Sequence, residues 1–213
     1  MQRSFEEEIL DGGGLPAETV DRVHRGLSLT HKLLGNHAAV LRAIRRDRQP
    51  VRRVLDIGCG HGALLEIVRR ETGAEVVGVD LSPPQCGARA FPILKRDAVR
   101  DALPAADVAI CVCLVHHLGD EEFVELIRNV GRTCGRFVIL DLVRHRLPLV
   151  LFSIFAPLCL PRINVLDGRQ SIRRAYTPDE FHALLVRALA GTGGRFRHTV
   201  APFRIRQMAD IRY

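Results

Sequence analysis

The stretch VLDIGCGHG, residues 54–62, decides how the rest of the chain is interpreted. Its first four residues continue a short apolar, β-rich run, and a helix is predicted over residues 61–71. Gly58 and Gly60 permit backbone conformations that a side chain would forbid, and they let a ligand approach the main chain closely. A strand, a glycine turn and a helix in this order predict a ligand site beside the free N–H groups that begin the helix.

The spacing of the glycines, and the acid before them, indicate which kind of ligand fits. A dinucleotide site requires the pattern G-x-G-x-x-G, whereas the glycines here fall at positions 58, 60 and 62. Asp56 stands just before the turn, where its carboxylate would repel a pyrophosphate but can pair with a cationic amine. The turn therefore favours a ligand that carries an amine over a dinucleotide.

Short apolar runs alternate with helical segments through the middle of the chain, and this alternation predicts a parallel sheet with helical crossovers. The fold class is therefore α/β, with a single Rossmann-like, doubly wound and mostly parallel sheet and an antiparallel hairpin at its edge. Strands are predicted over residues 53–57, 74–80, 92–95, 107–114 and 136–141, helices over 61–71, 120–133 and 177–190, and the hairpin over 196–200 and 203–208.

The two ends of the chain and one internal segment lie outside this alternation. Residues 1–50 are predicted to form an N-terminal helical cap, with a short helix over 17–29 and an amphipathic helix over 31–46. Residues 51–213 form the main domain. Within it, residues from about 144 to 174 are predicted to be an apolar insert after the fifth strand.

Two further acids stand at the ends of predicted strands. Asp80 ends the second strand and Asp97 follows the third. A carboxylate at the position of Asp80 can accept hydrogen bonds from both hydroxyls of a ribose. In parallel sheets such carboxyl-end positions bind ligands. Between the two acids, Pro83, Pro84 and Pro92 leave little room for a helix and predict a tight loop.

The run D-I-G-C-G-x-G, together with these acids in this order, resembles the first motifs of class I S-adenosylmethionine-dependent methyltransferases. The resemblance covers about residues 36–142. It implies S-adenosylmethionine as cofactor and S-adenosylhomocysteine as product, with the ribose near Asp80, and the adenine amino group on Asp97 with the N–H of Ala98. The cofactor residues implied are Asp56, Gly58, Cys59, Gly60, Asp80, Leu81, Asp97, Ala98, Cys113 and Leu114.

The residues after the fourth predicted strand, LVHHL at 114–118, are those that reach the methyl group and the acceptor in this family. With SIRRAYTPDEF at 171–181, they resemble small-molecule methyltransferases of the ubiquinone and menaquinone type. An Asn/Asp-Pro-Pro-aromatic run, typical of adenine methylation, is absent from the sequence. The predicted acceptor is therefore a small apolar or aromatic molecule, such as a natural product or quinone precursor, methylated on a hydroxyl or on carbon.

A hydroxyl acceptor benefits from a general base, and His116 and His117 are the candidates. We expect His116 to face the acceptor. For His117, the alternative to a general base is a buried structural role that holds the loop. Substrate contacts are predicted for Asp141, Arg173 and Tyr176.

The most apolar stretch is LPLVLFSIFAPLCLP, residues 147–161. It is too short to span a membrane and contains Pro157. A core or dimer helix, a lid over an apolar substrate, and a peripheral membrane contact are the three interpretations. We favour the lid, because the stretch follows the fifth strand on the edge where substrate must approach.

Composition limits the other classes of function. The formal net charge is +7 and the pI about 9.6, but the arginines are scattered, which argues against nucleic acid as partner. No Cys/His group has zinc spacing, so no metal is expected, and free cysteines without a signal-peptide pattern indicate the cytoplasm. An RNA methyltransferase and a non-catalytic cofactor-binding module are the alternative functions. The oligomeric state, monomer or homodimer, is left open.

Overall fold

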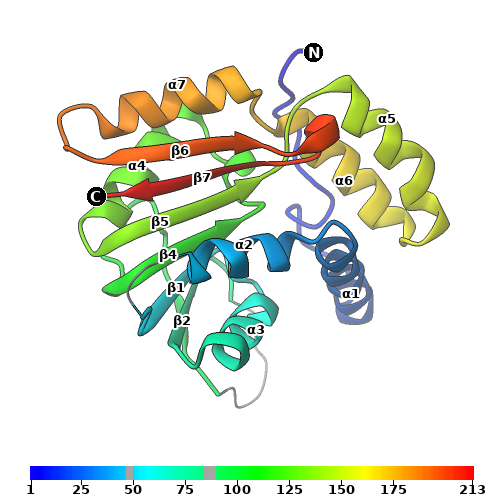
Figure 1. Cartoon of the computed structure of the whole chain (residues 1–213). Helices are drawn as coiled ribbons and strands as arrows, with labels where there is room; N and C mark the ends of the chain where they lie inside the picture. Colours follow the sequence, from blue (N-terminus) through cyan, green and yellow to red (C-terminus); the bar gives the residue numbers. More distant parts are fainter. Residues whose placement is uncertain (47–49, 84–89) are drawn as a thin grey trace.

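The computed structural model describes residues 1–46, 50–83 and 90–213, and its centre is one seven-stranded sheet (Figure 1). The strand order is β3-β2-β1-β4-β5-β7-β6. All pairs are parallel except those of β7, which runs antiparallel to both β5 and β6. The predicted doubly wound, mostly parallel sheet with an antiparallel edge hairpin is confirmed. The strands are β1 Arg53–Ile57, β2 Glu75–Asp80, β3 Ile93–Lys95, β4 Ala106–Val112, β5 Cys134–Asp141, β6 Arg195–Val200 and β7 Gln207–Arg212.

Helices cover both faces of the sheet. On one face α2 and α3 pack against β1, β2, β4 and β5, and on the other α4 and α7 enclose the larger part of the core. α1, α5 and α6 lie together beyond the carboxyl ends of the strands (Figure 1). The α-helices are α1 Ala17–Leu33, α2 Asn36–Arg45, α3 Ala63–Thr72, α4 Asp120–Gly131, α5 Arg146–Phe155, α6 Arg162–Arg174 and α7 Pro178–Leu189, and the 3₁₀ helices are η1 Val115–His117, η2 Ala156–Leu158 and η3 Pro202–Arg204.

The amphipathic segment 31–46 is not one helix, and the prediction was wrong at this point. Gly35 has φ 65°, a left-handed conformation that ends α1 and starts α2. α2 then buries Val40 and Ile44 against the sheet. The apolar spacing that the sequence shows continues across this break, so the spacing alone could not reveal it.

The second strand of the edge hairpin also differs from its predicted position. Phe203 and Arg204 have positive φ values of 57° and 55° and lie in a 3₁₀ turn, and the strand β7 starts only at Gln207. The charged residues of β7 hid it, because Asp210 and Arg212 interrupt its apolar pattern. In the folded chain Asp210 pairs with Arg136 of β5.

The insert after β5 consists of α5, η2 and α6. These helices pack on one another and α6 also contacts α1. The N-terminal segment, residues 1–16, runs beside α6 and is hydrogen-bonded to it by Asp167, Gln170 and Ser171. Among the described residues, no helix is both long and apolar enough to cross a membrane.

One buried ion pair ties the edge strand β7 to the sheet, and its loss should be measurable. The Arg136 guanidinium, 2% exposed, donates to Asp210 over 2.7 Å from both Nε and Nη2, and Nη2 also donates to the carbonyl of Ala43. We expect Asp210→Ala to lower the free energy of unfolding by about 3 kcal/mol, because it leaves a buried cation without its carboxylate. Urea unfolding measures this.

The matched control is Glu66→Ala, which removes the exposed pair between Glu66 and Arg69. This change should cost less than about 1 kcal/mol. Equal losses in the two variants would contradict the structural role of the pair between β5 and β7.

Candidate active site

A cavity of about 1390 Å³ lies at the carboxyl ends of β1, β2 and β4. Its other walls come from α1, the start of α2, the N-terminal segment, α5 and α6. Asp56, Gly58, Gly60 and Asp80 line it at one end and His116 and His117 at another. The predicted positions at the ends of separate strands therefore meet in one space.

The backbone of the glycine turn requires glycine at positions 58 and 60. Gly58 and Gly60 have φ values of 71° and 49°, in the left-handed region. A Cβ on Gly58 would lie 3.0 Å from the Leu114 side chain, while a Cβ on Gly60 would meet no described atom within 4 Å. The turn thus packs against the loop after β4 on one side and offers bare backbone to the cavity on the other.

Asp80 links the end of β2 to this turn. One carboxylate oxygen accepts the Gly60 N–H over 2.8 Å, and the other accepts the Ser82 N–H over 2.9 Å. Each oxygen keeps a lone pair for a further donor. Cys59 and Leu81 also line the cavity, and Leu81 is 65% exposed.

Asp56 is the buried acid of the site, with 3% of its surface exposed. Burial, with a smaller contribution from the negative charge of Asp80, raises the pKa of the Asp56 carboxyl to about 8. A carboxyl held in this way gains strongly from a cationic partner, because the partner replaces the lost solvation of the charged form.

Asp97 and Ala98 do not line the described part of the cavity. The Asp97 carboxylate accepts the Val99 N–H over 2.9 Å and an Arg100 N–H over 3.3 Å, as in a turn cap. The predicted tight loop before them includes residues 84–89, which lie outside the described residues. The adenine role of Asp97 and Ala98 stays a prediction.

The chain leaves β4 through a strained residue. Cys113 has φ 54°, a left-handed conformation that is uncommon for a residue with a side chain. The turn sends Leu114 against the glycine turn and brings η1, with both histidines, into the cavity wall. Burial raises the pKa of the Cys113 thiol, so this residue stays neutral there.

His116 is held between two acids. Its ring Nδ1 lies 2.7 Å from Asp141 Oδ1, and its backbone N–H donates to the other oxygen of Asp141 over 3.0 Å. Its Nε2 faces Glu8, 3.5 Å from Oε1. Burial opposes charge on this ring, but Asp141 and Glu8 outweigh burial and raise the pKa of His116 to about 9. Asp141 thus contacts His116 and does not line the cavity.

His117 is 24% exposed at its side chain and has two acids of its own. Its Nδ1 lies 3.0 Å from Asp11 Oδ2, and its Nε2 lies 3.7 Å from the same Glu8 oxygen. Glu8 and Asp11 belong to the N-terminal segment and line the cavity. The sequence analysis missed both residues. The acidic run EEE at 6–8 in a basic chain was the available signal.

The side chains of the predicted substrate residues Arg173 and Tyr176 lie outside the cavity wall. Tyr176 donates its hydroxyl to the Leu118 carbonyl over 2.9 Å, and the Arg3 guanidinium stacks 3.7 Å from its ring. The Arg173 carbonyl accepts the Ser4 N–H. Neither side chain lines the cavity, whereas the neighbouring Arg174 does and donates to the His117 carbonyl.

The apolar wall of the cavity comes from the insert. The residues that contribute to it from α5 are Pro148, Leu151, Phe152 and Phe155. The outward side of the same segment is also apolar, since Val150, Ile154 and Leu158 are 53%, 57% and 81% exposed. The cavity is thus polar at the strand ends and apolar beneath α5.

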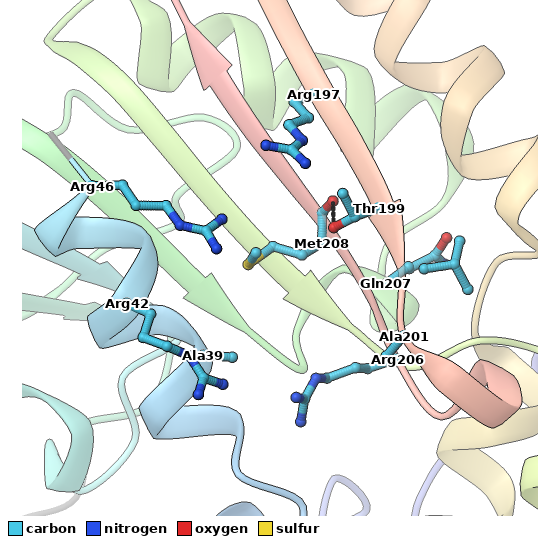
Figure 2. Close-up of a pocket in the computed structure, with 10 residues that line it drawn as sticks. Ala39, Arg42, Arg46, Arg197, Thr199, Ala201, Arg206, Gln207 and Met208 are labelled. Carbon is cyan, nitrogen blue, oxygen red and sulfur yellow. Dashed lines mark hydrogen bonds between the residues drawn. The ribbon is translucent and has the colours of Figure 1, made fainter.

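A second, smaller cavity of about 280 Å³ lies between α2 and the β6–β7 hairpin (Figure 2). Arg42, Arg46, Arg197 and Arg206 line it, and none of these four lines the larger cavity. Arg206 donates to Asn36 Oδ1 and to the Leu34 carbonyl. No carboxylate within the described ranges forms an ion pair with Arg42, Arg46 or Arg197. The fold therefore gathers arginines that are scattered in the sequence.

Comparison with known proteins bears on this site. The family described as a methyltransferase domain matches residues 55–136. No curated protein matches the chain by sequence.

Three solved structures illustrate the likeness of fold. The plantazolicin methyltransferase BpumL, solved with a desmethyl analogue of plantazolicin and S-adenosylhomocysteine, is 14% identical with a TM-score of 0.70, over 91% of this chain and 88% of that one. Human N-acetylserotonin methyltransferase with S-adenosylmethionine is 22% identical with a TM-score of 0.63, over 99% of this chain and 62% of that one. The methyltransferase domain of a bacterial Hen1 is 18% identical with a TM-score of 0.62, over 87% of this chain and all of that one.

The sheet order, the glycine turn at the end of β1 and the matched methyltransferase domain agree with one another. Residues 55–136 match a methyltransferase domain, and the fold is that of solved methyltransferases that bind S-adenosylmethionine or S-adenosylhomocysteine. The resemblance inferred from the run D-I-G-C-G-x-G is confirmed at this level. The finer likeness to ubiquinone and menaquinone enzymes stays a prediction.

Proposed function

We propose that the enzyme transfers a methyl group to a hydroxyl of a small apolar or aromatic molecule. One observation carries this proposal: a single cavity runs from the glycine turn and its acids, past the His116–Asp141 pair, to the apolar wall of α5. Its volume of about 1390 Å³ exceeds the roughly 300–1,000 Å³ of a pocket for one ligand. There is room for the cofactor and a small acceptor together.

The residues at the strand ends fit S-adenosylmethionine. Asp56 supplies a buried negative charge for the ammonium group, Asp80 has lone pairs for ribose hydroxyls, and Gly60 leaves its Cβ space empty. Cys59, Leu81, Cys113 and Leu114 would complete this end of the cavity. When bound, the cofactor supplies an electrophilic methyl group on a sulfonium.

His116 is proposed to be the general base. When bound, S-adenosylmethionine would supply the methyl group to the acceptor oxygen and leave as S-adenosylhomocysteine, which would retain the electron pair of the broken carbon–sulfur bond. The neutral form of His116 would accept the acceptor proton on Nε2, so the rate should rise as pH approaches its pKa of about 9. Asp141 accepts from Nδ1 over 2.7 Å, which fixes the tautomer and stabilises the charged ring. A hydroxyl acceptor, more than a carbon, makes use of such a pair.

The insert is proposed to be the lid that selects the acceptor. The α5 side chains on the cavity wall offer an apolar surface without charge, which favours an aromatic or aliphatic body. Closing an apolar wall over the reacting atoms also excludes water, and methyl transfer requires a water-poor pocket. N-acetylserotonin methyltransferase, named for a small acceptor, is among the proteins with a similar fold.

The test is a product assay with the purified protein, S-adenosylmethionine and a panel of phenols, catechols and hydroxyquinone precursors. We expect a methylated phenol by mass spectrometry, with one S-adenosylhomocysteine formed per product. Leu151→Asp should lower kcat/KM for an apolar phenol at least tenfold without affecting cofactor binding, and the matched control is Val150→Asp on the exposed side of α5. Cofactor binding with no turnover on any panel member would refute the proposal.

RNA is the second candidate acceptor, and the four arginines of the smaller cavity favour it (Figure 2). A phosphate chain there would bind more weakly as salt rises, because counterions are released on binding. An arm of the assay with total RNA separates the two functions. RNA methylation that falls steeply between 50 and 200 mM salt, on the order of the range in which such contacts are lost, would replace the small molecule as acceptor.

A further inference from the structure

Three side chains that could bind a metal ion meet in the cavity wall. Glu8, His116 and His117 each offer one ligand atom, and these atoms all lie within 4.8 Å of one another. The sequence predicts no metal, because its histidines and cysteines lack zinc spacing. The fold brings in the third ligand from the N-terminal segment, far away in sequence.

The distances are longer than those of ordinary hydrogen bonds and suit a shared cation. The Nε2 atoms of His116 and His117 lie 3.5 and 3.7 Å from the same oxygen of Glu8, Oε1. An N–H···O hydrogen bond would be about 2.7–3.2 Å. Ligand atoms bound tetrahedrally at roughly 2.1 Å from Zn²⁺ lie about 3.4 Å from each other. The two separations to Glu8 match edges of such a site, and all three ligand atoms lie within 4.8 Å of one another.

Both imidazole rings are oriented by a carboxylate at Nδ1, as is common for histidines that bind a metal through Nε2. Nδ1 of His116 lies 2.7 Å from Asp141, and Nδ1 of His117 lies 3.0 Å from Asp11. A histidine that donates one ring N–H to a carboxylate presents the lone pair of its other nitrogen to a metal. In this cluster both free nitrogens are Nε2 and both face Glu8. Two independent carboxylates thus fix the same tautomer in adjacent residues.

Glu8 is positioned by the fold and is not a loose terminal side chain. Its Oε1 accepts the hydroxyl of Ser171 over 2.7 Å. The next two residues donate their N–H groups to Asp167 over 2.8 and 3.2 Å. Arg174 donates to the carbonyl of Glu6. These contacts with α6 keep the carboxylate opposite the two rings.

We infer that Glu8, His116 and His117 form a binding site for one divalent transition-metal ion of the Zn²⁺ or Co²⁺ type. Two imidazoles and one carboxylate suit such ions better than Mg²⁺ or Ca²⁺, which prefer oxygen ligands. Three carboxylates, Glu8, Asp11 and Asp141, surround the two rings. Among the arginines and lysines that the structure describes, only Arg174 pairs with one of them, 3.6 Å from Asp11. A divalent ion balances this charge within the described cluster.

The inference deepens the proposed function, since all three ligands line the same cavity. Three protein ligands leave a position open to the cavity for the acceptor oxygen. A metal there would lower the pKa of the acceptor hydroxyl and so replace the base role of His116 in the metal-bound enzyme. The proton and the metal compete for Nε2 of His116.

The test is a titration of the EDTA-treated, cofactor-free protein with Co²⁺, followed by visible absorption, with Zn²⁺ as competitor. We expect one equivalent to bind. Glu8→Gln and His117→Ala should each weaken binding at least a hundredfold, and Asp11→Asn about tenfold through the orientation of His117. The matched control is Glu7→Gln, which also lines the cavity but is not one of the three ligands.

Binding of S-adenosylhomocysteine by calorimetry shows that each variant is folded. Less than a tenth of an equivalent of Co²⁺ bound by the unmodified protein would overturn the inference, as would unchanged affinity in both Glu8→Gln and His117→Ala. Because metal binding is measured without methyl transfer, it can fail while the proposed function stands, and the proposed function can fail while metal binding stands.

Discussion

Asp56→Asn should weaken the binding of S-adenosylmethionine about a hundredfold or more. The carboxylate is 3% exposed in the cavity wall, so an ammonium group paired with it would form a buried charge pair. Removing one member of a buried, hydrogen-bonded charge pair costs about 3 kcal/mol, which corresponds to about two powers of ten in Kd. Calorimetric titration of the variant with cofactor measures the loss.

The same residue predicts a proton linkage. Burial, and to a lesser extent the charge of Asp80, raises the pKa of Asp56 to about 8, so the cofactor-free protein holds a proton there at pH 6.5. Pairing with an ammonium group requires the carboxylate, and binding should therefore release close to one proton at that pH. Affinity should rise with pH between 6 and 7.5, below the pKa of the cofactor amine at roughly 8. Titrations in buffers with different ionisation enthalpies count the protons.

Two controls separate binding from folding. Glu75→Gln changes an exposed acid at the far end of β2 and should leave Kd within about twofold. In the parent, the folded protein keeps a proton on Asp56 that the unfolded chain releases, so the free energy of unfolding of the parent falls as pH rises from about 4 to 8. At pH 7.5, Asp56→Asn should therefore unfold no more easily than the parent. Full cofactor affinity in Asp56→Asn, with unchanged proton release, would disprove the assigned pairing.

His116→Ala should lower kcat for methyl transfer about a hundredfold to ten-thousandfold, the range that general-base catalysis contributes. The ring is 2% exposed and lines the cavity. The variant lacks Nε2, the atom proposed to accept the proton of the acceptor hydroxyl. The assay uses EDTA-treated protein, so that no bound metal replaces the base. The Kd of S-adenosylhomocysteine should stay within a few-fold, because the residue lies away from the acids at the glycine turn.

Asp141→Asn tests whether Asp141 acts through His116. An amide in its place can present N–H to Nδ1 and favour the wrong tautomer, so kcat should fall while KM changes little. His117→Ala should cost less, since its Nδ1 is held by the exposed Asp11. His37→Ala, another histidine of the cavity wall, is the matched control. Full activity in both His116→Ala and His117→Ala would remove the histidines from the mechanism.

The cofactor end of the site could be predicted from the sequence because it is local. The glycines at 58 and 60 and the acid at 56 lie within one turn, and the requirement for left-handed backbone is visible in the residue types themselves. The position of Asp80 in the site could also be predicted, because each strand is a short apolar run and parallel strands end at one edge of the sheet. The roles assigned to these residues remain proposals for the experiments above.

The acceptor end depends on contacts between distant segments. Glu8 and Asp11 reach the histidines only because α6 holds the N-terminal segment, and the EEE run that contains Glu8 reads as a solvated surface in the sequence. The four arginines beside the β6–β7 hairpin meet for the same reason, after β7 pairs with β5 (Figure 2). The predicted range of β7 was wrong, because a charged residue such as Asp210 is typical of loops. In the folded chain the ion pair with Arg136 allows Asp210 to lie within a strand.

The sequence by itself determined the alternation of strands and helices over residues 53–141 and the glycine turn, because periodicity and glycine content act over a few residues and need no partner. Only the tertiary structure decided which charges meet. A buried acid, an imidazole or a guanidinium is defined by what desolvates it and what faces it, and both come from segments that the chain brings together only when it folds.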